Sequence, residues 1–363
     1  MQQNKYSDYK IFAFPDKVDS FRTGTLTAPV YVRIKPINRC SHACHWCVYS
    51  DGTLRPKDRA GKHLQAGMHG QMKEQDTMPT AKALELITDL ARIGTKAVTF
   101  SGGGEPLLHK DITDIMYSTV QNNIDLSIIT NGQQLSGTRA DILRHAKWVR
   151  VSMDYTSALQ MQESRNVPER FYDEVINNLT KFAANKKAGC DLGVNFIITR
   201  SNYEGIVPFA KLLKDCGVEN IRFSPVYVQG FKEYHTPIAP RVLEQLQECQ
   251  TFCTDTFSIN TTYDLTSPSK ASSHAFNRCL YAQTTPVVGA DLNIYACHNT
   301  AYTAHGLITG MQDRTFSEAW FSPEAQEWHA KFRPCVSCNH ECANHNKVAL
   351  YEALATDSYD AFV

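Results

Sequence analysis

The chain has 363 residues, of which 42% are hydrophobic and 20% charged, a composition typical of a globular protein with one large and one smaller domain. Its 37 Lys and Arg residues equal its 37 Asp and Glu residues, so net charge indicates neither nucleic-acid binding nor attraction to an anionic membrane. No apolar run has signal-peptide character or approaches the roughly 18 residues that span a bilayer. We therefore expect a cytoplasmic protein, in which the 12 cysteines do not form a disulfide framework and the clustered ones are metal ligands or catalytic thiols.

Short β-branched runs alternate with longer helical patterns along most of the chain. We predict strands at 29–37, 96–102, 125–132, 148–154, 192–199 and 220–227, and helices at 80–94, 109–121, 136–146, 168–187, 203–216 and 238–256. Six β/α units in series predict an α/β fold with a parallel sheet, curved into a partial (β/α)6 TIM-like barrel. In such folds the chemistry lies at the C-terminal ends of the strands.

Four motifs follow the first four predicted strands. They are "CSHACHWC" at 40–47, "SGGGEP" at 101–106, "TNG" at 130–132 and "SMD" at 152–154. Because the ends of parallel strands share one rim, the four motifs indicate a single site.

The cysteine motif has two interpretations. Cys40, Cys44 and Cys47 with His42 or His45 would make a tetrahedral zinc site, since spacings of two to four residues suit zinc. Zinc does not explain the glycine-rich carboxylate motif at the next strand end. An open coordination position would instead distinguish a working metal centre from a structural one.

Cys40, Cys44 and Cys47 in CxxxCxxC spacing after the first strand, with Trp46 before the last cysteine and "GGE" after the second strand, resemble the radical SAM superfamily. The resemblance implies that the three thiolates bind three irons of a [4Fe-4S] cluster. The fourth iron would bind the amino and carboxylate groups of S-adenosylmethionine (SAM), which is cleaved reductively to a 5'-deoxyadenosyl radical that abstracts hydrogen from the substrate. His42 and His45 are then not ligands.

The same resemblance implies a set of SAM contacts. Gly103, Gly104 and Glu105 would line the methionine amino group, where glycines permit close backbone approach and a carboxylate accepts from an ammonium. The remaining contacts would be Trp46 near the adenine, Ser152 and Asp154 at the ribose, and Arg165 at the SAM carboxylate. Strand-end capping is the alternative for Ser152 and Asp154, and a solvated charge is the alternative for Arg165. Asn131 is a weaker candidate within a turn.

Other polar and cysteine residues receive no chemical role. The segment 48–79, including His63 and His69, is predicted to be a long loop. Cys190 and Cys216 stand singly, and Cys249 and Cys253 share a helix face, so packing is the preferred explanation for all four.

Beyond residue 272 a hairpin is predicted around "GADLN", with Cys279 and Cys297 at its ends, followed by a helix with the capping box "TFSE" and Pro323 at a first helical position. The motif "CVSCNHEC" adds Cys335, Cys338 and Cys342. Four such thiolates suit either structural zinc or an iron-sulfur cluster. The arrangement resembles SPASM and twitch extensions, which implies a second [4Fe-4S] cluster on Cys279, Cys297, Cys335 and Cys338. Cys342 would be spare or a substitute, and His298 and His345 are adjacent alternatives.

We divide the chain accordingly. The predicted parts are an N-terminal segment (1–27), the barrel (28–235), a connecting helix and linker (236–272), a small cysteine-rich hairpin-plus-helix domain (273–345) and a C-terminal tail (346–363).

Three functions remain open from the sequence. They are a radical SAM oxidoreductase or modifying enzyme acting on a peptide, the same chemistry on an amino sugar, nucleoside or base, and a zinc-stabilised α/β binding protein. A complete second cluster would favour a net oxidation, with a one-electron donor such as flavodoxin or ferredoxin. Only about 28 residues precede the first strand, which weighs slightly against recognition of a leader peptide.

Overall fold

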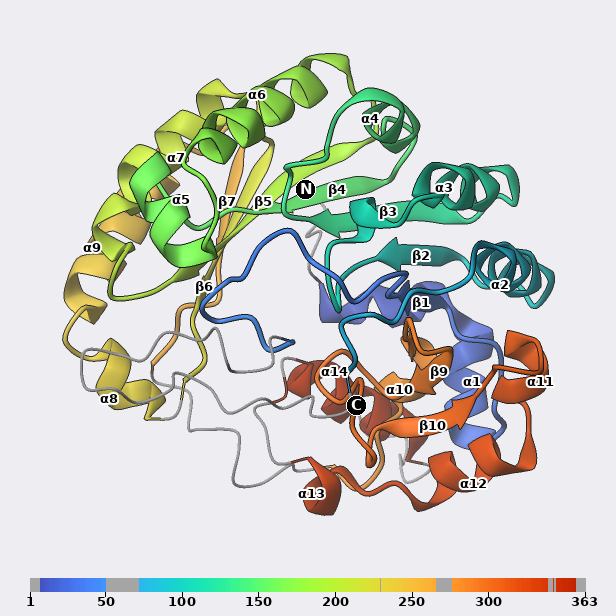
Figure 1. Ribbon diagram of the computed structural model, residues 1–363. Helices are drawn as coiled ribbons and strands as arrows, with labels where there is room; N and C mark the ends of the chain where they lie inside the picture. The colour runs from blue at the N-terminus through green and yellow to red at the C-terminus, as the bar shows by residue number, and fades with distance from the viewer. Residues whose placement is uncertain are drawn as a thin grey trace.

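The computed structural model describes residues 7–49, 72–228, 230–265, 276–338, 342 and 344–356. Its central feature is a ten-stranded sheet in the order β10-β9-β8-β1-β2-β3-β4-β5-β6-β7 (Figure 1). Most of the predicted loop at 48–79 lies outside the described residues. The same holds for part of the predicted linker and for the end of the chain.

The barrel part of the sheet is parallel and follows chain order. Its strands are β1 (Tyr31–Ile34), β2 (Ala97–Phe100), β3 (Asp125–Thr130), β4 (Trp148–Ser152), β5 (Asp191–Ile198), β6 (Asn220–Pro225) and β7 (Ser258–Thr261). The six predicted strands and the partial-barrel class are confirmed. Strand β7 was assigned to a linker, because its four residues include one aliphatic side chain, Ile259, and so give no apolar run.

Helices cover the outer face of this curved sheet (Figure 1). They are α2 (Thr80–Arg92), α3 (Ile112–Gln121), α4 (Gly137–Leu143), α6 (Arg170–Asn185), α7 (Ile206–Asp215) and α9 (Ala239–Gln250). Shorter elements lie between them: η2 (Pro106–Leu108), α5 (Ala158–Arg165), η3 (Tyr203–Gly205) and α8 (Phe231–His235). Every second strand residue, such as Val32, Phe100 and Val149, is fully buried against these helices. The remaining strand residues face the inside of the barrel.

The cysteine-rich region extends the barrel sheet. It contains α10 (Tyr281–Thr284), β8 (Val287–Val288), β9 (Asn293–Tyr295), β10 (Leu307–Gly310), α11 (Phe316–Trp320), α12 (Pro323–Lys331), α13 (Pro334–Ser337) and α14 (His345–Ala355). The hairpin, the Thr315–Glu318 capping box and Pro323 at the helix start are confirmed. The hairpin was predicted as part of a separate small domain, whereas β8 pairs in parallel with β1. This pairing satisfies backbone groups that would otherwise lie at an exposed sheet edge.

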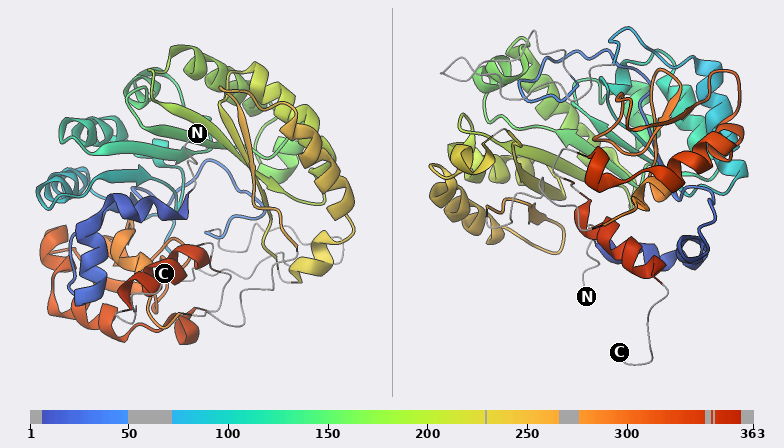
Figure 2. Two further views of the ribbon diagram at one scale, coloured as in Figure 1. Left: turned by 180° about the vertical axis from the view of Figure 1, so that it is seen from behind. Right: turned by 90° about the horizontal axis from the view of Figure 1, so that it is seen from below.

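The two ends of the chain pack together. Helices η1 (Asp8–Ala13) and α1 (Pro15–Thr23) lie against α14, where the rings of Phe21 and Tyr351 stack at 5.4 Å (Figure 2). We predicted no helix in either terminal segment. Helices this short gain their stability from the partner they pack on, which lies more than 300 residues away in sequence.

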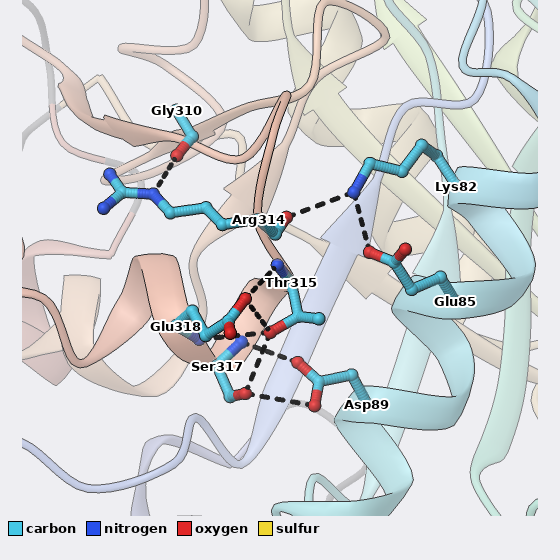
Figure 3. Close-up of polar contacts among 8 residues, drawn as sticks. All are labelled: Lys82, Glu85, Asp89, Gly310, Arg314, Thr315, Ser317 and Glu318. Atoms are coloured by element: carbon cyan, nitrogen blue, oxygen red, sulfur yellow. Dashed lines mark hydrogen bonds and ion pairs between the residues drawn. The ribbon is translucent and has the colours of Figure 1, made fainter.

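A polar contact joins the cysteine-rich region to the barrel helix α2 (Figure 3). Asp89 is buried, and its carboxylate accepts from the Ser317 backbone N–H at 2.6 Å and from the Ser317 hydroxyl at 3.1 Å. Arg92 donates to the same carboxylate at 2.6 Å. About two turns earlier on α2, Lys82 donates to the Arg314 carbonyl at 3.1 Å. Among the described residues, no helix is both long and apolar enough to cross a membrane.

Asp89→Ala is expected to lower the free energy of unfolding by about 2–4 kcal/mol, because it leaves the buried Ser317 N–H without its carboxylate. Urea denaturation measures this change. Glu85→Ala on the same helix is the control, since Glu85 contacts the half-exposed Lys82 and not α11. Equal stability of the two variants would contradict the role of Asp89.

Candidate functional site

The segment 35–49, which we call the cysteine loop, leaves the C-terminal end of β1 and crosses the ends of the next strands. Backbone hydrogen bonds join it to the "GGE" segment: Gly104 donates to the Ile37 carbonyl at 3.1 Å and Glu105 to the Arg39 carbonyl at 3.0 Å. On its other side, Ala43 donates to the Arg165 carbonyl at 2.8 Å. The structure therefore brings the first and second sequence motifs together at one rim, beside the last residue of α5 (Ala158–Arg165).

The three thiols of the loop differ in exposure. Cys40 is exposed, and its sulfur accepts from the His42 N–H at 3.4 Å, while Cys44 and Cys47 are half-buried. Burial raises the pKa of Cys44 to about 11, although the positive charge of Arg165 opposes this effect. Metal binding would have to displace these protons, as thiolate ligation generally does.

The two histidines of the loop lie in different surroundings. His42 is buried and its ring stacks on Phe171 at 6.5 Å. Burial, followed by the charge of Arg165, lowers the pKa of His42 to about 3. His45 meets the Trp46 ring edge-on at 6.4 Å, and burial lowers its pKa as well. Burial therefore favours the neutral form of both rings.

Arg165 is the main side-chain support of the cysteine loop. It is buried at the end of α5, where it donates to the Asp154 carboxylate at 2.5 and 3.2 Å and to the Ser152 carbonyl at 3.3 Å. The remaining guanidinium nitrogen, Nη1, donates to the Cys44 sulfur at 3.0 Å. Trp46 lies beside it, with its ring centre 5.5 Å from the guanidinium carbon. The side chain assigned by resemblance to the SAM carboxylate thus holds a cysteine and the end of β4.

The glycines of the "GGE" segment are required because the cysteine loop approaches their backbone closely. A Cβ on Gly104 would overlap the Arg39 carbonyl, and one on Gly103 would overlap the Asn38 side chain. Any larger residue at these two positions would push the cysteine loop away from the strand ends.

Glu105 faces inward, toward β3. Its buried carboxylate accepts from the Thr130 hydroxyl at 2.7 Å, the Asn131 N–H at 2.7 Å and the Leu107 N–H at 3.1 Å. Burial raises the pKa of Glu105, whereas these hydrogen bonds lower it. The Asn131 amide in turn donates to Ser41 at 3.1 Å. Asn131, a weak candidate in sequence, therefore links the third motif to the cysteine loop.

The second group of cysteines lines one pocket beside the barrel. Cys279, Cys297, Cys338 and Cys342 line it together with apolar residues, among them Phe276, Tyr281, Phe332 and Val348. Burial, followed by the charges of the other three thiols, raises the pKa of Cys279 well above its usual value. Four soft donors around one apolar pocket match the ligand set of a cluster.

Cys335 and Cys342 differ in their relation to this pocket. Cys335 lies in the one-turn helix α13, is exposed and does not line the pocket, whereas Cys342 is half-buried and lines it. The geometry thus favours Cys342, the predicted substitute, over Cys335, which the CxxC spacing suggested.

A chain of hydrogen bonds connects the two cysteine groups. Lys35, fully buried at the end of β1, donates to the Tyr49 hydroxyl at 2.8 Å and to the Gly102 carbonyl. Tyr49, two residues after Cys47, donates to the carbonyl of His298 at 3.0 Å. Sequence motifs do not predict Lys35 or Tyr49, because a single lysine and a single tyrosine carry no spacing signal.

The remaining cysteines are not grouped. Cys190, Cys216 and Cys249 are buried as expected, whereas Cys253 is exposed because it lies past the end of α9. Within the described part of the chain, no three Cys, His, Asp or Glu side chains converge on a single-ion site.

Comparison with known proteins gives matches of limited extent to curated sequences. The SAM-dependent nucleotide dehydratase of Lacinutrix mariniflava is 25% identical over 140 residues, covering 35% of this chain and 27% of that protein. The GTP 3',8-cyclase of Limosilactobacillus fermentum is 33% identical over 119 residues, covering 32% of this chain and 30% of that protein. The chain thus spans about a third or less of the length of these relatives.

The structural match is more extensive. SuiB of Streptococcus suis, solved with S-adenosylmethionine bound, superimposes with a TM-score of 0.63 at 16% identity, covering 92% of this chain and 77% of SuiB. At this identity the likeness establishes the fold.

The sequence profile of the Radical SAM superfamily matches residues 34–227, which is more than half of the chain and includes the cysteine loop, the "GGE" segment and Arg165. The chain therefore belongs to the radical SAM superfamily, whose members use a [4Fe-4S] cluster and SAM.

Proposed function

We propose that this chain is a radical SAM enzyme in which Cys40, Cys44 and Cys47 hold the cluster and leave one iron for SAM. The observation that carries the proposal is the backbone pairing of the cysteine loop with Gly104 and Glu105 at the strand ends. Three thiols on a loop with a fourth position open fit a catalytic rather than a structural centre. When bound, cluster and SAM supply a 5'-deoxyadenosyl radical for hydrogen abstraction.

Within this proposal the chain's residues divide into binding and support. The backbone of Gly103 and Gly104 lines the amino group of SAM, and the absence of Cβ atoms at both positions lets the cysteine loop pack directly on this segment. Trp46 and Ser152 remain proposed contacts of the adenosine, whereas the buried carboxylate of Asp154 is already paired with Arg165. Glu105 and Arg165 act by holding the neighbouring loops, because their polar groups already contact protein.

We further propose a second [4Fe-4S] cluster on Cys279, Cys297, Cys338 and Cys342, in a SPASM- or twitch-like extension. The shared pocket of these cysteines supports this assignment. A cluster with four protein ligands has no open iron for substrate, which favours electron transfer and hence a net oxidation. A one-electron donor such as flavodoxin or ferredoxin would reduce the enzyme.

Two substrate classes are supported by different relatives. SuiB was also solved with its precursor peptide SuiA bound, which supports a peptide substrate. The two sequence relatives described above act on nucleotides by name, which supports a phosphorylated small molecule.

Cys44→Ala is expected to abolish SAM cleavage by dithionite-reduced enzyme, because it removes one of three ligands to the first cluster. Cys279→Ala should leave SAM cleavage intact while reducing iron content, since it changes only the second cluster. Formation of 5'-deoxyadenosine and the iron-to-protein ratio are the measurements. SAM cleavage by Cys44→Ala, or a colourless wild-type protein that binds only zinc after anaerobic purification, would contradict the proposal.

Cys342→Ala and Cys335→Ala are expected to differ, because only Cys342 lines the pocket. In a Cys40→Ala, Cys44→Ala, Cys47→Ala background, which isolates the second cluster, Cys342→Ala should lose most of the remaining iron. Cys335→Ala should retain it. Iron analysis and Mössbauer spectroscopy measure the difference, and the reverse result would assign the ligand to Cys335.

Arg165→Gln is expected to destabilise the fold by about 3–5 kcal/mol and to lower iron at the first cluster, because it leaves the buried Asp154 carboxylate without its partner. Thermal unfolding of Arg165→Gln measures the change in stability. The iron content of a Cys279→Ala protein that also carries Arg165→Gln measures the loss at the first cluster. Arg170→Gln, five residues along on α6, is the exposed control. Normal stability and normal iron content in Arg165→Gln would contradict the supporting role of this residue.

A further inference from the structure

One aromatic residue, Phe332, lines both the pocket of the second cysteine group and a shallow hollow on the protein surface. In the wall of the pocket it stands together with Cys338 and Cys342. The hollow is open to solvent and is lined by Ile308, Glu324, Glu327, Trp328, Lys331 and Phe332. Phe332 itself is buried, with 8% of its surface exposed. It therefore forms part of the wall between the cysteine pocket and water.

Trp328 holds Phe332 in this wall. The two rings stack with their centres 4.3 Å apart and their planes 17° from parallel. The Phe332 N–H donates to the Trp328 carbonyl at 2.8 Å, where α12 ends. Arg333 donates to the Phe332 carbonyl at 3.1 Å. Both the ring and the backbone of Phe332 are thus fixed.

Helix α12, which lies beside β10, gives the stack a firm base (Figure 1). Ser322 caps its first turn by accepting from the Ala325 N–H at 3.3 Å, and Ala325 is fully buried. About one turn later, Trp328 packs against the main core and meets the His329 ring edge-on at 5.2 Å. The core therefore sets the position of Trp328 independently of the cysteine segment that follows it.

The described wall of the cysteine pocket is mostly apolar. Phe276, Tyr281, Ala296 and Val348 line it, and each is at most 8% exposed. An apolar shell controls how far water reaches a metal site and so tunes its reduction potential. Among the described residues of this wall, Phe332 is the one that also lines the outer hollow. The exposure of a cluster in the pocket therefore depends on Phe332.

The sign of the effect follows from charge. An iron-sulfur cluster held by four thiolates is an anion, and one-electron reduction makes it more negative. Exclusion of water disfavours the more highly charged state, as it does for other buried ions. A closed wall therefore lowers the reduction potential of the cluster, and an opened wall raises it. A low potential lets the cluster pass its electron to an external carrier instead of retaining it.

We propose that Trp328 and Phe332 set the reduction potential of the second cluster by closing its pocket toward the outer hollow. Phe332 excludes water, and Trp328 is a positioning residue because it acts by holding Phe332. This inference rests on the proposed second cluster, to which it adds the residues that tune its potential.

The test is an EPR-monitored redox titration of the full-length protein carrying Cys40→Ala, Cys44→Ala and Cys47→Ala, in which only the second cluster contributes. In this parent protein, Trp328→Ala should raise the ratio of reduced to oxidised cluster at a fixed potential roughly tenfold, which is a shift of about 59 mV for a one-electron couple. Trp328→Phe keeps a stacking ring and should restore the parent potential. Phe332→Leu keeps an apolar side chain but loses the stack. It should raise the potential by a smaller amount, and it keeps the test open if Trp328→Ala does not fold.

Phe321→Ala is the matched control, because Phe321 is 37% exposed between α11 and α12 and lines neither the pocket nor the hollow. It should leave the potential unchanged. Ordinary packing predicts that Trp328→Ala and Phe332→Leu lower stability without changing the potential, and that result with an intact cluster would overturn the inference. A shift to lower potential would overturn it as well. Absence of a [4Fe-4S] signal from the parent protein would instead contradict the proposed second cluster, and the inference would fail with it.

Discussion

The structure depends on strand β1 being paired along both edges. On one side it pairs with β2 of the barrel, and on the other with β8 of the cysteine-rich region. Pairing on both edges fixes the direction in which the chain leaves Ile34 and enters the cysteine loop. If β8 were absent, β1 would be an edge strand with unpaired backbone groups. The barrel and the second cysteine group are therefore built on a shared strand.

This arrangement has a consequence for communication between the two cysteine groups. Lys35 follows β1 directly, and its ammonium contacts both the Gly102 carbonyl and the Tyr49 hydroxyl. Tyr49 contacts the backbone of His298, the neighbour of Cys297. Lys35 is fully buried, and burial lowers its pKa well below the usual value, so it is held by neutral acceptors at some cost in free energy. A displacement of the cysteine loop or of the segment around Cys297 would disturb these hydrogen bonds, so the two cysteine groups are mechanically linked.

Sequence reasoning succeeded where periodicity and motif position carry the information. The six β/α units were predictable because the spacing of apolar residues distinguishes the core-facing side of each strand and helix from its other side. The four motifs could be placed at one rim because parallel strands end on the same side. Strand β7, with its single aliphatic residue, gave no such signal, and α1 and α14 obtain their stability from each other. Cys335 was preferred over Cys342 on spacing alone, whereas burial separates them in the structure.

The supporting roles of Glu105 and Arg165 could not be predicted from a sequence motif. Both residues match positions that a family resemblance associates with SAM, yet each carries a buried charge whose protein partners are already in place. Hydrogen bonds of this kind depend on how neighbouring loops meet, which spacing along the chain does not encode.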